Sequence, residues 1–148
     1  MENEDLLRVL FEKVYVTEQV ALELDAGRLL RSDTINPRLF DWITLISISQ
    51  EEMDTLPPNR LGIGEQSVIA YARIHANCVV GLDDRQARIL AEHLGLKVVG
   101  VIGILLKAKR AGLLSSVRPF LEAAQAHGFR MAKELYEEAV RLAGEENE

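Results

Sequence analysis

The chain has 148 residues, 48% of them hydrophobic, which suits one domain with a sizeable core and excludes a disordered tail. Its 23 acidic and 17 basic residues give a formal charge of -6, which argues against a surface devoted to wrapping duplex DNA. The acidic start lacks the features of a signal peptide, no apolar run approaches the ~20 residues of a membrane span, and the single cysteine, Cys78, has no disulfide partner in the chain. We therefore expect a protein of the reducing cytoplasm that does not bind a membrane.

The first half of the chain alternates short apolar segments that predict both helices and strands. The predicted elements are a helix over residues 5–11, a strand over 14–16, a helix over 18–26 and a strand over 42–48. Thr17 can cap the second helix, and Gly27 is placed to end it. The strand over 42–48 carries apolar residues on both faces, as a partly buried strand does.

The second half shows clearer periodicity. The predicted elements are a helix over 65–76, a short apolar strand that ends at Asp83, a helix over 85–94, a strand over 97–101, a helix from Gly103 to about Ala111, a helix after Ser116 that ends at Gly128, and a helix over 131–143. Gly95 ends one helix, Gly103 turns the backbone closely into another, and Ser116 serves as an N-cap. Strands that alternate with helices predict an α/β fold with a mainly parallel sheet.

Acidic residues gather where two of these elements begin or end. Glu65 opens a helix, and Asp83 and Asp84 close the strand that follows it. Ligands usually bind at the edge formed by the carboxyl ends of parallel strands, so these acids suggest a divalent metal site. Each acid also has a purely structural alternative, because Glu65 can favour the helix dipole and Asp84 can cap the helix that begins at Arg85.

Several segments together resemble the PIN-like proteins of the DUF3368 group over nearly the whole chain: VYVTEQVALEL, LGIGE, VVGLDDRQAR, LGLKVVGVIGILLKAKRAGL, SVRPFLEAAQAHGFR and ELYEEAVRLAGE. The resemblance implies a single domain over residues 1–148 with a three-layer α/β/α fold and a mainly parallel central sheet. It also implies a relationship to toxin-type ribonucleases that use Mg²⁺ or Mn²⁺ and are paired with an antitoxin protein.

The resemblance implies three site residues, since Glu23, Glu65 and Asp83 match the second, third and fourth acidic positions of the family pattern. Adjacent strand residues point to opposite faces, so we favour Asp83 over its neighbour Asp84 for the metal cluster. The family's first strand and its Asp have no counterpart here, so the expected fold is truncated at its N-terminus. We therefore expect weak or absent nuclease activity.

The missing strand would be central in the family's sheet, and its two neighbours would then expose unpaired backbone groups. Three outcomes are open: the neighbours pair directly, residues 42–48 fill the gap, or a second chain completes the sheet. An open sheet edge favours a homodimer.

The basic residues Arg85, Lys107 and Arg110 are candidates for contact with an RNA backbone, because Lys107 and Arg110 lie three residues apart on one helical face. Lys107 and Arg110 can also be ordinary solvent-exposed residues near a helix C-terminus, where cations are favoured, and we favour that explanation. Two functions from different classes remain: a metal-dependent endoribonuclease, and a catalytically degenerate relative that acts as a binding or assembly module.

Overall fold

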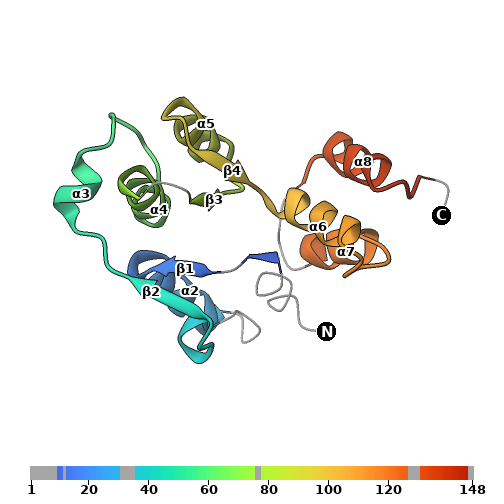
Figure 1. Cartoon of the computed structure of the whole chain (residues 1–148), viewed down its shortest axis with the longest axis horizontal. Coiled ribbons are helices and arrows are strands. Elements are labelled where there is room, and N and C mark those ends of the chain that lie inside the picture. The colour runs from blue at the N-terminus through green and yellow to red at the C-terminus, as the bar shows by residue number, and fades with distance from the viewer. Residues whose placement is uncertain (1–9, 12, 31–35, 76–77, 127–130, 147–148) are drawn as a thin grey trace. The chain divides into compact units, whose positions relative to one another are not determined.

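The computed structural model describes residues 10–11, 13–30, 36–75, 78–126 and 131–146 (Figure 1). These residues form two compact units, one that ends at Val99 and one that begins at Gly100, and each is described by itself. The helix predicted over residues 5–11 lies almost wholly outside the described residues, as does Gly128.

The first unit contains β1 (Val14–Thr17), α2 (Glu18–Leu30), the 3-10 helix η1 (Pro37–Leu39), β2 (Ile43–Ile46), α3 (Gln50–Asp54), α4 (Ile63–Ile74), β3 (Val79–Gly81), α5 (Arg85–His93) and β4 (Lys97–Val99). The second contains α6 (Val101–Arg110), α7 (Arg118–Ala126) and α8 (Lys133–Leu142). Helices thus alternate with strands through the first unit, and all described strand pairs are parallel. The predicted α/β class is confirmed.

The strands of the first unit pair two by two. β1 is parallel to β2 with Val14 opposite Ile43, and β3 is parallel to β4 with Val79 opposite Lys97. Among the described residues no hydrogen-bonded pairing joins β1 to β3. Direct pairing of the two neighbours of the missing strand, one of the three expected outcomes, is therefore not found in this part of the chain. The predicted strand over 42–48 lies beside β1, as β2, and does not bridge the pairs.

Helix α4 organises the first unit, since it packs against both β1 and β3 and against α2, α3 and α5. Ile69, in the middle of the helix, is fully buried. Its core neighbours are Ile48, Met53, Leu56, Ala70, Ala72, Val80, Leu82, Ala87 and Ala91. Complete burial of one such aliphatic side chain contributes about 2 kcal/mol, so Ile69 fixes the middle of α4 to the core.

Three predicted boundaries were wrong, and two of them involve glycines. Gly27 lies inside α2, which continues to Leu30, and Gly103 lies inside α6. The strand predicted over 97–101 ends at Val99 because α6 starts at Val101, where the Gly100 carbonyl already accepts the Ile104 N–H at 3.1 Å. A glycine in a helix is unfavourable by only about 1 kcal/mol, which hydrogen bonding and packing of the surrounding turns overcome.

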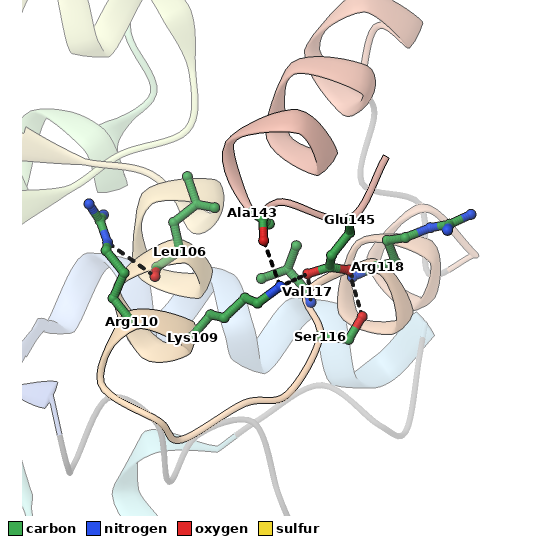
Figure 2. A network of polar contacts seen from close by, with 8 residues as sticks. All are labelled: Leu106, Lys109, Arg110, Ser116, Val117, Arg118, Ala143 and Glu145. Carbon is green, nitrogen blue, oxygen red and sulfur yellow. Dashed lines mark hydrogen bonds and ion pairs between the residues drawn. The ribbon is translucent and has the colours of Figure 1, made fainter. Parts of the chain in front are cut away.

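The second unit is held together by one buried carboxylate, that of Glu145, whose side chain is fully shielded from solvent (Figure 2). Its oxygens accept hydrogen bonds from Lys109 Nζ at 2.8 Å, Ser116 Oγ at 2.6 Å, and the backbone N–H groups of Val117 and Arg118 at 2.8 and 3.3 Å. Burial alone would raise the pKa of Glu145, but these hydrogen bonds outweigh it and lower the pKa to about 2.

This arrangement corrects the role expected for Ser116. Its hydroxyl donates to Glu145, and the carboxylate of Glu145 is the group that accepts backbone N–H groups at the start of α7. The first N–H groups of a helix have no partner within the helix, so an acid from far along the chain satisfies two of them. The same acid pairs with Lys109 near the end of α6 and therefore links three segments of the unit.

Candidate functional site

Glu65 lies in the first turn of α4, where the loop after α3 enters the helix at Gly62. Its side chain is partly buried, and burial is the main reason that the pKa of Glu65 is raised above its ordinary value. The nearby carboxylates of Asp84 and Glu23 raise it further, while a backbone hydrogen bond from Gly62 lowers it. Glu65 therefore lies where an acid favours the helix dipole, as its structural alternative requires, and it also lies near two other acids.

Glu23 reaches the same place from a different helix. It lies in α2, and its Oε1 accepts a hydrogen bond from the backbone N–H of Gly64 at 3.1 Å. That N–H belongs to the first turn of α4, where the helix itself provides no acceptor. The contact therefore ties the side chain of Glu23 to the residue that immediately precedes Glu65.

Asp83 and Asp84 do not lie on the strand but in the loop beyond it. β3 ends at Gly81, and one further hydrogen bond, from Leu82 N–H to the Val99 carbonyl at 3.0 Å, extends its pairing with β4. Both aspartates are exposed, and strand alternation, which led us to prefer Asp83, does not apply to them.

The N-cap role expected for Asp84 is confirmed. Its Oδ2 accepts the backbone N–H of Ala87 at 2.9 Å, in the first turn of α5. Asp84 also lies near enough to Glu65 to raise its pKa, so one aspartate both starts a helix and contributes charge to the acidic site. The assignment of Asp83 as a ligand stays a prediction.

Glu23 and Asp84 both act on the charge of Glu65, and these three acids have the chemistry of a site for a hard cation, since all their donors are oxygens. Within the described parts of the chain, however, no three His, Cys, Asp or Glu side chains are close enough together to hold a metal ion. Mg²⁺ is commonly held by one or two carboxylates, with water and substrate phosphate as its other ligands. The acids fit a site of that kind and not a fully enclosed protein cage.

Sequence reasoning missed a pair of buried hydroxyls behind the acids. Thr17, at the end of β1, is 2% exposed and Ser67, in α4, is 0% exposed, and their oxygens lie 2.7 Å apart. Ser67 Oγ donates to the Gly64 carbonyl at 2.6 Å, and Thr17 accepts the Val20 N–H at 3.1 Å, which confirms Thr17 as the cap of α2. The sequence signal that could have predicted this pair was the presence of two small polar residues, Thr17 and Ser67, within otherwise apolar faces.

The basic residues expected to contact RNA fall in different units. Arg85 is exposed and opens α5 directly after Asp84. Lys107 and Arg110 lie in the last turn of α6, where Arg110 Nε donates to the carbonyl of Leu106 at 3.4 Å. Cations are favoured at a helix C-terminus, which agrees with the structural explanation for these two.

Helices long and apolar enough to cross a membrane are absent from the described part of the chain.

Comparison with protein families gives one match, in which the model described as DUF3368: PIN domain covers residues 1–145. No curated protein and no solved structure matches the chain. The match extends over both compact units, and it agrees with the parallel strands and alternating helices described above. PIN domains have a nuclease-like fold associated with nucleic-acid binding, and they generally use divalent metal ions.

Proposed function

Because the chain belongs to the DUF3368 family of PIN domains, we propose that it binds RNA and is a weak or inactive relative of toxin-type endoribonucleases that use Mg²⁺ or Mn²⁺. Both units would belong to one PIN-like domain over residues 1–148, since the family model spans them without interruption.

The observation that carries this proposal is the convergence of three acids at the start of α4. The Glu23 carboxylate accepts the N–H of Gly64 at 3.1 Å, directly before Glu65, and Asp84, the N-cap of α5, is close enough to Glu65 to repel its negative charge and, in addition to burial, raise its pKa. Nearby acids that destabilise one another gain most from a cation placed among them. A divalent ion would relieve this repulsion, and the same raised pKa would make its binding weaker at low pH.

Each residue then has a defined task. Glu65 and Asp84 would hold the ion, and Glu23, tethered to Gly64, would stand beside them as a further acceptor. When bound, the ion would neutralise charge on the scissile phosphate and activate a water. Arg85 adjoins Asp84 on the exposed start of α5, where its guanidinium would contact a neighbouring phosphate of the RNA.

A catalytically degenerate binding or assembly module is the second candidate, and a specific observation favours it. No described group of three potential ligands is compact enough to hold a metal, and one oxygen of Glu23 is already engaged with the backbone. Each described sheet has only two strands, so both of its strands are edges at which another chain can add. We propose a second copy of the chain and an antitoxin protein as partners in this role, within the cytoplasm.

Calorimetric titration with Mn²⁺, followed by an RNA-cleavage assay with and without Mg²⁺, separates the two candidates. The ribonuclease predicts Mn²⁺ binding and Mg²⁺-dependent cleavage that are both lost in Glu65→Gln. Glu92→Gln, an exposed acid in α5, is the matched control and should leave both unchanged. RNA binding without Mn²⁺ binding would support the degenerate module, and absence of RNA binding would refute the proposal that the chain binds RNA.

A further inference from the structure

We infer that Gly64, together with the buried hydroxyls of Thr17 and Ser67, is a positioning device that fixes the carboxylate of Glu23 beside Glu65. Its importance for a bound cation rests on the proposed function, whereas the positioning of Glu23 is argued from the contacts of these residues alone. None of these three residues carries a charge, and each would act only through Glu23.

The first part of the device is the missing side chain of Gly64. A Cβ atom at this position would lie 2.5 Å from Oε1 of Glu23, 2.7 Å from its Oε2 and 2.7 Å from its Cδ. Heavy atoms that are not bonded do not approach so closely, so any larger residue would displace the carboxylate. This close approach of the carboxylate to the backbone allows the Gly64 N–H to donate a hydrogen bond to Oε1 of Glu23 at 3.1 Å.

The second part holds the Gly64 peptide itself. Ser67 donates its only hydroxyl hydrogen to the Gly64 carbonyl, so the hydroxyl of Thr17 must donate to Ser67 across their 2.7 Å contact. Thr17 in turn accepts the N–H of Val20, in the first turn of α2. The hydrogen bonds therefore run from the start of α2 to the carbonyl of Gly64, the residue whose N–H binds Glu23 of the same helix.

A tether is needed because Glu23 has a long side chain on an exposed part of α2. Such a side chain loses rotational freedom when it is held in one position, and a single hydrogen bond to a well-anchored peptide supplies the compensating interaction. The three atoms nearest to an added Cβ are all at the far end of this flexible side chain. Gly64→Ala should thus move Glu23 while leaving the fold intact, which distinguishes positioning from structural support.

The first experiment compares Mn²⁺ affinity in Gly64→Ala and Gly81→Ala by calorimetry. At Gly81 an added Cβ would meet no atom within 4 Å. We expect Gly64→Ala to weaken Mn²⁺ binding by about tenfold or more, as loss of a group that orients a ligand typically does, and Gly81→Ala to leave it within about twofold. If the wild type binds Mn²⁺ and Gly64→Ala binds it with equal affinity, the inference is overturned.

The second experiment reads the geometry without metal. In the wild type, the amide proton of Gly64 should show the downfield NMR shift of a hydrogen bond to a carboxylate, and Glu23→Ala should move it upfield. In Gly64→Ala, a crystal structure should show the Glu23 carboxylate turned away from α4. If the Gly64 amide is unaffected by Glu23→Ala, the inference is wrong, whatever the metal experiment gives. If the geometry holds and the wild type fails to bind Mn²⁺, the proposed metal-dependent ribonuclease fails and the positioning of Glu23 stands.

Discussion

Replacing Glu145 by Gln should strongly destabilise the second unit, in which its side chain is fully buried. The substitution keeps the shape of the side chain but removes the charge that faces Lys109 Nζ at 2.8 Å and the two backbone N–H groups at the start of α7. It also places an amide NH₂ group where one carboxylate oxygen now accepts hydrogen bonds. A donor would then face other donors in a site closed to water.

The pKa of Glu145 gives the magnitude. Its ordinary value of 4.5 falls to about 2 in the folded protein, so the charged form contributes about 3 kcal/mol of stability at neutral pH. Because the folded pKa is the lower one, this contribution is complete above pH 4.5 and is lost as the pH falls towards 2. We expect Glu145→Gln to lower the free energy of unfolding by about 2–3 kcal/mol at pH 7 and to have little effect near pH 2.

Urea unfolding followed by circular dichroism at several pH values measures this difference, and hydrogen exchange locates it. The amides of Val117 and Arg118 should lose protection in Glu145→Gln, since Glu145 accepts both. Glu146→Gln removes the same charge from the exposed neighbouring residue and serves as the control. A loss below about 0.5 kcal/mol, which is the range of ordinary surface changes, or an effect of equal size at pH 2 would refute the reasoning.

Three further outcomes are expected. Asp84→Ala should destabilise the protein by about 1 kcal/mol in urea because it uncaps α5, whereas Asp84→Ser should retain most of the stability, and equal losses would contradict the cap. Thr17→Val should cost about 1–3 kcal/mol in thermal unfolding because it breaks the buried contact with Ser67, with exposed Thr44→Val as a control that should change little. Asp84→Asn should lower the raised pKa of Glu65 towards its ordinary value in an NMR titration, since one of the charges that raise it is removed, and an unchanged pKa would contradict a contribution from Asp84.

The sequence predicted the order of elements better than their ends. The periodicity that predicted helices over 65–76 and 85–94 agrees with the structure, since Ile69 and Ala72 of α4 and Ala87 and Ala91 of α5 are buried. Boundaries failed where a local preference competed with packing, as at Gly103 within α6. The short helix α3 was missed, although the capping box formed by Ser49 and Glu52 was legible in the sequence.

The candidate site was harder to predict because its parts are joined by long-range contacts. The position of Glu65 at a helix start and the cap made by Asp84 follow from local rules, and both were foreseen. The hydrogen bond between Glu23 and Gly64 joins residues 41 positions apart, and no local pattern reports it. The buried acid Glu145 was missed for the same reason, since its partners lie near the ends of other helices.

The placement of Glu145 has a consequence for how the chain acquires its structure during synthesis. Val117 donates to a carboxylate that lies 28 residues further along, so the start of α7 leaves the ribosome before the acid that completes its first turn can reach it. Until then the ammonium group of Lys109 and two backbone amides can bind only water. We therefore expect released chains truncated before residue 145 to remain sensitive to proteases between α6 and α7, and chains that include this residue to be resistant.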